Sequence, residues 1–253
     1  MRYYLRFMLV AAGCGAFAMI YYIFPDKTIS SAQLIDILGM VNIIDVPTYL
    51  RHITFLYGSM VFFEIFFGTY IYRHFCTANY YFFSRKNNRI KWFLCECIKL
   101  YGYALGYILA QIIGAGIFAV FARLVYYDPL MWRECFFYIM IYSAHLMAVT
   151  LLINVISILT NSTVAFTVVE LIIMGQIAAY SMSFRLFGIG EGEFKALKYN
   201  PFAYMVFWVQ QEYNRYVQGI VIYLVLVILV AMAGCIVVSR HDFIQSNNET
   251  EGF

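Results

Sequence analysis

Residues Glu64 to Lys99 read EIFFGTYIYRHFCTANYYFFSRKNNRIKWFLCECIK. The stretch begins as the end of an apolar segment, becomes aromatic and basic, and then returns to an apolar segment. Six of the seventeen lysines and arginines of the chain lie in it: Arg73, Arg85, Lys86, Arg89, Lys91 and Lys99. A basic segment between two membrane spans is typical of the cytoplasmic side of a membrane. The stretch therefore predicts both a membrane protein and its orientation.

The composition of the whole chain agrees with a membrane protein. Of the 253 residues, 63% are hydrophobic and only 12% are charged, and the mean hydropathy is +0.74. A soluble domain has about twice that share of charged residues. Apolar runs of about 18 to 22 residues recur, each long enough for a helix to cross the hydrocarbon core. These runs predict an all-α integral membrane protein, because a barrel has alternating segments of about ten residues. The net charge of +3 gives no indication of nucleic acid as a partner.

Six transmembrane helices are predicted in a single domain, 1–253. Nine of the lysines and arginines then lie on the inner side, where they are concentrated, and eight lie outside, diluted by acids. This distribution predicts that both termini are cytoplasmic. The first run has an alternative interpretation as a signal peptide, since Ala16-Phe17-Ala18 resembles a cleavage site, but its length favours an uncleaved span. The six predicted spans are 7–24, 53–70, 100–121, 135–159, 164–184 and 220–238.

Two outer segments have a mixed character. Between Ser30 and Thr48, apolar and polar residues alternate as in a short interfacial helix, for which Ser31 is a candidate N-cap. The stretch 185–218 contains helix-breaking residues, yet Pro201 to Val209 is apolar. We expect this stretch to be partly re-entrant, because non-helical backbone at membrane depth is tolerated where protein or a wet cavity covers it.

No catalytic or cofactor motif is present in the sequence. The P-loop pattern GxxxxGK[ST] is missing, and so are HExxH, GxSxG and paired-cysteine metal motifs. The four histidines are scattered along the chain, and the six cysteines lie mostly in or beside apolar runs. The sequence therefore nominates neither a metal site nor a nucleotide site of its own, and it identifies no enzyme.

A few polar residues lie inside the predicted spans. Glu64 and Glu170 are the acids there, and an acid in hydrocarbon is costly unless it is paired or faces the bundle interior, an interface or water. For Glu64 we consider a snorkelling residue near the inner face and a coupling or dimer contact. Uncharged polar residues at membrane depth either bridge helices or line a cavity. This second set consists of Gln111, His145, Asn154 and Gln176.

Several short patterns together resemble the permease subunit of a type-2 ABC exporter. Glu64-Ile-Phe-Phe-Gly68-Thr69 is similar to the E-x-x-x-G-T that this family has at the inner end of its second span, and Ser84-Arg85 with the basic residues after it is similar to the lead into the third. Asn200-Pro201-Phe202-Ala203-Tyr204 resembles its N-P-x-x-Y before the last span, and Ser239-Arg240-His241-Asp242 resembles the end of that span. The gap between Thr69 and Ser84 is longer than in the family pattern, and the usual proline before the S-R pair is missing.

The resemblance implies a division of labour between chains. Two permease chains, identical or homologous, would form a pathway, and two separate ABC ATPase subunits would carry ATP and Mg²⁺ and dock beneath them. Arg73 to Tyr81 would be the coupling helix, and its alternative interpretation is a plain interfacial helix. Glu64, Gly68 and Thr69 would make coupling or dimer contacts. The residues implied in docking the ATPase are Arg73, His74, Phe75, Tyr80, Tyr81, Arg85 and Arg89.

The substrate implied by the resemblance is an amphipathic or hydrophobic peptide. The predicted outer loops are short, and the chain is similar to small exporters of Gram-positive bacteria that expel cytolytic peptides, including phenol-soluble modulins. We therefore expect a bacterial plasma membrane protein. Gln111, His145 and Gln176 are candidates for lining the pathway, and Asn200, Pro201 and Tyr204 mark the re-entrant segment. Lipid, glycan or drug export, and a membrane immunity or sensor protein without transport, are the alternatives.

Overall fold

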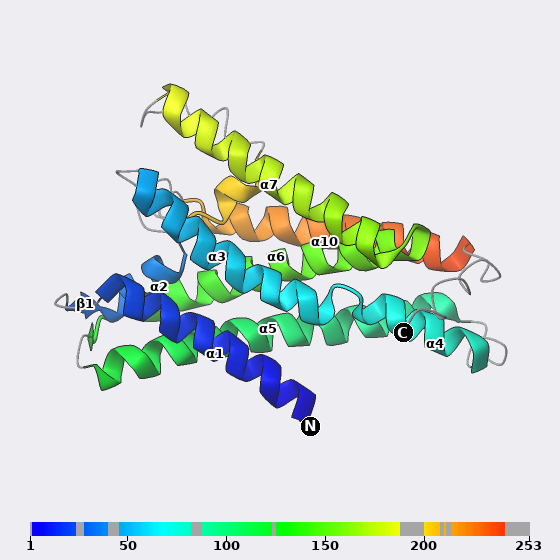
Figure 1. Ribbon diagram of the computed structural model, residues 1–253, viewed down its shortest axis with the longest axis horizontal. Helices are drawn as coiled ribbons and strands as arrows, with labels where there is room; N and C mark the ends of the chain where they lie inside the picture. Colours follow the sequence, from blue (N-terminus) through cyan, green and yellow to red (C-terminus); the bar gives the residue numbers. More distant parts are fainter. Residues whose placement is uncertain are drawn as a thin grey trace.

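The computed structural model describes residues 2–23, 28–39, 46–81, 88–122, 125–187, 200–207, 210 and 214–240, with only the backbone described at some helix ends. Long helices lie side by side and form an elongated bundle (Figure 1). The elements, in chain order, are α1 (Arg2–Ile23), β1 (Ile29–Ser30), α2 (Ser31–Leu38), α3 (Val46–Phe67), α4 (Tyr70–Tyr81), α5 (Arg89–Phe121), β2 (Val125–Tyr126), α6 (Met131–Leu159), α7 (Ser162–Phe187), η1 (Pro201–Tyr204) and α10 (Tyr216–Arg240).

The prediction of a helical membrane protein is confirmed. Five segments of the described chain are long and apolar enough to cross a membrane: Ile53–Cys76, Arg89–Phe121, Met131–Leu159, Ser162–Met182 and Tyr216–Arg240. They coincide with the second to sixth predicted spans. The first predicted span coincides with α1, in which Arg6–Ile20 forms a shorter apolar helix.

One helix differs from its predicted bounds in a way that shapes one end of the bundle. The third span was predicted to begin at residue 100, but α5 begins at Arg89 and has 33 residues. A helix of that length is about 50 Å long, well beyond the roughly 30 Å of a hydrocarbon core. The side chain of Asn88 accepts a hydrogen bond from the Lys91 N–H (3.2 Å) and so caps this early start. The first turns of α5 therefore run alongside α4 (Figure 1).

The centre of the bundle is α6. Every residue from Ile141 to Leu151 is buried, and α6 packs against α2, α3, α4, α5, α7 and α10. In contrast, α7 and α10 present many apolar side chains outward, among them Leu171 and Ile172 on α7 and Ile228 and Leu229 on α10. Such outward apolar surface suits contact with lipid, whereas α6 is enclosed by protein.

The end of the bundle opposite α4 is held by short polar contacts (Figure 1). β1 pairs with β2 in parallel, with Ile29 opposite Val125. The predicted cap Ser31 is not the N-cap of α2; Ser30 is, because its hydroxyl accepts from the Gln33 N–H (3.1 Å) and the Gln33 side chain accepts from the Ser30 N–H (2.9 Å). Ser31 instead accepts from the backbone N–H of Asp128 (2.8 Å), which joins the start of α2 to the segment before α6.

Residues 200–207 fold as irregular backbone covered by protein. Asn200 caps the short helix η1 by accepting from the Phe202 N–H (3.0 Å), and residues 202–207 are buried. The Tyr223 hydroxyl donates to the carbonyl of Pro201 (2.7 Å), and the Phe207 N–H donates to the carbonyl of Gly39 (2.8 Å). These bonds satisfy polar backbone that would otherwise be costly in an apolar setting.

Helices α1 and α5 approach each other at small residues. A Cβ atom added to Gly114 of α5 would overlap the backbone of Ala12 in α1, and one added to Gly15 would overlap the carbonyl of Gln111. Glycine at these two positions therefore lets the two backbones touch, as small residues do between membrane helices.

Alanine substitutions at two glycines of α5 should separate packing from helix propensity. We expect Gly114→Ala to lower the free energy of unfolding by about 1–3 kcal/mol, because the new methyl group forces α1 away. Gly116→Ala is the matched control, since a Cβ there meets nothing within 4 Å and alanine favours a helix by up to about 1 kcal/mol. Thermal unfolding in detergent measures both, and equal behaviour of the two variants would contradict the close α1–α5 contact.

Candidate functional site

The predicted coupling segment is a helix that continues α3 after a two-residue break. α3 ends at Phe67, and α4 begins at Tyr70. At the break, the N–H of Gly68 still donates to the carbonyl of Glu64, and the N–H of Arg73 donates to the carbonyl of Thr69 (2.9 Å). A Cβ on Gly68 would lie 2.5 Å from the Glu64 carbonyl oxygen, which favours glycine at this position.

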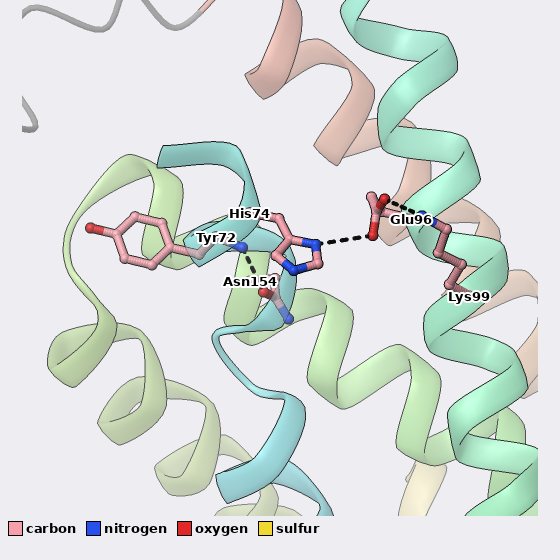
Figure 2. Close-up of polar contacts among 5 residues, drawn as sticks. All are labelled: Tyr72, His74, Glu96, Lys99 and Asn154. Carbon is pink, nitrogen blue, oxygen red and sulfur yellow. Dashed lines mark hydrogen bonds and ion pairs between the residues drawn. The ribbon is translucent and has the colours of Figure 1, made fainter. Parts of the chain in front are cut away.

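The break is held by a side chain from α6, as Figure 2 shows in part. Asn154 is fully buried, and its Oδ1 accepts a hydrogen bond from the backbone N–H of Tyr72 (3.0 Å). Its Nδ2 donates to the carbonyl of Phe67 (3.1 Å) and to that of Thr150 (2.7 Å) in its own helix. One amide therefore bonds to the last residue of α3 and to the first turn of α4, and it fixes both to α6.

A second buried polar residue fixes the other side of α4. Glu96 of α5 is only 4% exposed, and its Oε2 lies 3.4 Å from Nδ1 of His74 in α4. Its other oxygen accepts from Nζ of Lys99 (2.7 Å), one turn along α5. Figure 2 shows the three side chains in line between the two helices. This ion-pair network connects α4 to the extended start of α5.

Aromatic rings fill the space around that network. The Tyr70 ring lies 4.3 Å from the His74 ring and also contacts Tyr103 of α5 at 5.6 Å. Phe75 stacks on Trp92 with ring centroids 5.8 Å apart, and Phe75 is 2% exposed. α4 is therefore packed against α5 along an aromatic face, and it is joined to α5 by the Glu96 carboxylate.

The residues predicted to dock an ATPase do not share one environment. Arg73 and His74 are exposed, and half of the His74 side chain is accessible. Phe75 was predicted to face a partner, but it is buried against Trp92 and holds α4 in place. Arg89 begins α5 and is partly exposed. The side chains of Tyr80 and Tyr81, and all of Arg85, lie outside the described residues.

The residues of the E-x-x-x-G-T pattern lie at the break itself. Gly68 and Thr69 form its turn. Glu64 precedes them by one helical turn, is 1% exposed, and has both carboxyl oxygens without a hydrogen-bond partner among the described residues. Its carboxyl thus faces the inside of this chain, which does not suit the snorkelling interpretation.

The three candidates for lining a pathway are distributed over three helices. Gln111 lies on α5 and is buried where α1 makes its close approach. His145 of α6 packs edge-on against Tyr223 of α10, with ring centroids 5.2 Å apart. Gln176 of α7 contributes its backbone carbonyl, which accepts from Nδ2 of Asn200 (2.8 Å) and joins α7 to the segment before α10.

A polar cavity of about 610 Å³ lies at the opposite end of the bundle, and none of these three residues lines it. Glu134 of α6 forms part of its wall, where it accepts from Arg133 (2.8 Å) and from the Tyr216 hydroxyl (3.0 Å). Asp36 and Asp128 also line it. In the described part of the chain, no group of three His, Cys, Asp or Glu side chains is placed to hold a metal ion.

Sequence reasoning missed the role of Glu96 and treated Asn154 only as a general helix bridge. A signal for Glu96 exists, because it is the only acid between Glu64 and Asp128 and lies in a basic stretch. For Asn154 the sequence gives its membrane depth but not the helix break that it faces. Comparison with protein-family models, with curated proteins and with solved structures returns no match.

Replacing Asn154 should release the α3–α4 break. In Asn154→Leu the Tyr72 N–H and the Phe67 carbonyl lose the hydrogen bonds that Asn154 makes to them, and a buried polar group left unsatisfied costs about 1–3 kcal/mol. We expect a lower melting temperature in detergent and faster hydrogen exchange at the Tyr72 amide. Ser157→Ala is the control, because the Ser157 hydroxyl donates to the Ile153 carbonyl of its own helix (2.7 Å) and, within the described residues, does not bridge to another helix. Unchanged exchange at Tyr72 in Asn154→Leu would contradict the bridging role.

Replacing Glu96 should loosen α4 without altering the break. In Glu96→Gln the charge that attracts His74 and Lys99 is lost, so we expect faster hydrogen exchange along 70–76 than in the wild type. Lys99→Gln is the matched control, since it removes one cation but leaves the contact between Glu96 and His74. If hydrogen exchange along 70–76 is as slow in Glu96→Gln as in Lys99→Gln, the Glu96 carboxylate does not hold α4. The aromatic contacts would then be sufficient to hold the helix.

Proposed function

We propose that this chain is the membrane-spanning permease subunit of an ATP-driven ABC exporter, with six spans, both termini in the cytoplasm and α4 as its coupling helix. The observation that carries the proposal is the setting of α4. It is a short aromatic and basic helix at one end of the bundle, fixed by buried polar contacts to two other helices, and it still exposes Arg73 and His74. A surface on which another protein pushes needs both properties.

The contacts of α4 give a route for such a push. A displacement of α4 acts on α6 through Asn154, on α5 through Glu96, and on α3 through the break at Gly68. Because α6 is the buried centre of the bundle, motion passed to it reaches α2, α7 and α10, which all pack on α6. Coupling of this kind requires contiguous packed elements, and these contacts supply them.

The energy source in this proposal is a separate ABC-type ATPase, two copies per complex of two permease chains in a bacterial plasma membrane. The sequence has no P-loop, so nucleotide would bind on the partner. The basic residues at this end, Arg73, Arg89 and Lys91, suit an acidic or polar partner surface. We propose amphipathic or hydrophobic peptides as the substrate, since the bundle has many aromatic side chains and short described outer elements.

Reversal of two charges on the proposed docking surface tests the assignment. We expect Arg73→Glu/Arg89→Glu to weaken binding of the ABC-type ATPase encoded nearest to this chain by at least about tenfold, a loss of about 1.4 kcal/mol, with a matching loss of ATPase stimulation. Co-elution in detergent and ATP turnover measure the two effects. Arg240→Glu, which reverses one exposed charge at the end of α10, is the control.

Three results would redirect the proposal. Unchanged binding in the double variant would remove the docking role of these two arginines. Failure of the wild-type chain to hold any ABC-type ATPase would favour the immunity or sensor function instead. If the complex forms but its ATPase activity responds to lipid vesicles or an apolar drug and not to an amphipathic helical peptide, the substrate class changes and the permease assignment stays.

A further inference from the structure

Two buried polar side chains lie at the α3–α4 break, and they differ in one respect. Asn154 uses its amide fully, with one acceptor bond and two donor bonds. Glu64, one turn before Gly68 on α3, is 1% exposed, and neither of its carboxyl oxygens has a hydrogen-bond partner within the described part of the chain. Buried polar groups are nearly always bonded, so a bare carboxyl beside a helix break requires an explanation.

The surroundings of Glu64 supply no compensating charge. The described elements that pack most closely against α3 include α1, α4, α5 and α6. None of their described titratable side chains makes a hydrogen bond to the carboxyl. The Tyr107 hydroxyl is occupied by the Ser59 carbonyl (2.8 Å), and His74 is paired with Glu96. The titratable side chains of these four elements include Cys14, Tyr70, His74, Glu96, Lys99, Tyr103, Tyr107 and His145.

A bare carboxylate in such a place would cost several kcal/mol, whereas a neutral carboxylic acid would cost far less. The arrangement described here therefore requires a proton on Glu64. Ionisation would require the carboxyl to reach water or a cation. The break at Gly68 is the point where α3 ends, and two of the hydrogen bonds that fix it come from Asn154 of another helix.

We propose that Glu64 is a proton-binding site that sets the position of α4: the described conformation holds Glu64 in its neutral form, and loss of the proton opens the α3–α4 break. The step is a simple transfer, in which the carboxyl O–H bond breaks and the proton passes to water while Glu64 keeps the negative charge. Lower pH favours the described conformation, and higher pH favours the opened one. The inference does not depend on the transport assignment.

The native Trp92 reports on the position of α4, because it stacks on Phe75. A variant with Trp132→Phe and Trp208→Phe keeps Trp92 as its single tryptophan. In detergent, we expect its emission to change with pH in a transition between about pH 5 and about pH 9. Glu64→Gln, which imitates the protonated acid, should abolish that transition and keep the low-pH emission at every pH.

Two controls separate Glu64 from its titratable neighbours. His74→Gln removes the imidazole that precedes Phe75 on α4, and the Glu64 transition should persist in it. In infrared difference spectra, Glu64→Gln should remove one band of a protonated carboxyl that the wild type shows at neutral pH. Glu170→Gln changes a second carboxyl without a hydrogen-bond partner among the described residues, and it should leave the Glu64 band in place. Glu64→Met is a second neutral variant and should also fold and be insensitive to pH.

Three outcomes would overturn the proposal. The first is a wild-type infrared spectrum without a protonated carboxyl band that depends on Glu64. The second is a Trp92 transition that survives in Glu64→Gln or disappears in His74→Gln. The third is unfolding of both neutral variants, because a site that holds a neutral acid should accept a neutral side chain of similar shape.

Discussion

A break in a membrane helix leaves polar backbone that has to be bonded by protein, and here a single amide on α6 supplies the bonds. Asn154 accepts from Tyr72 and donates to Phe67, so the end of α3 and the start of α4 are both fixed to the central helix. Without a donor and an acceptor at that depth, residues 53–76 would be expected to continue as one helix, as their hydropathy alone suggests. The position of α4 therefore depends on a residue more than seventy positions away in sequence.

The second constraint on α4 is the buried carboxylate of Glu96 on α5. Glu96 is buried, but it faces His74 on one side and Lys99 on the other, so its desolvation is offset by two bonds. The side chains of His74 and Lys99 are 50% and 54% exposed, so the desolvation of these two partners is small. The contact thus joins a buried anchor on α5 to the accessible surface of α4, and it does so beside the Phe75–Trp92 stack.

The helical fold was predictable because each span carries its own signal, an apolar run of sufficient length. The helix at 70–81 was predictable from its aromatic and basic composition, although its start lies three residues earlier than expected. What the sequence could not show is which helices meet. The partnership of His74 with Glu96 and that of Asn154 with Tyr72 both join residues far apart in the chain. The burial of Phe75 was missed for the same reason. Its neighbour Trp92 lies on α5, and the sequence does not show that this part of α5 packs against α4.

Asn154 and Glu64 have opposite effects on the α3–α4 break. The amide makes three hydrogen bonds, which oppose a change in the break. The carboxyl has no hydrogen-bond partner among the described residues, so a change that brings it to water or a cation would stabilise its charged form. In the proposed switch, loss of the proton of Glu64 on α3 competes with the hydrogen bonds that Asn154 of α6 makes to α3 and α4. A helix that transmits motion needs two stable arrangements, because an element with only one cannot change position in response to a partner.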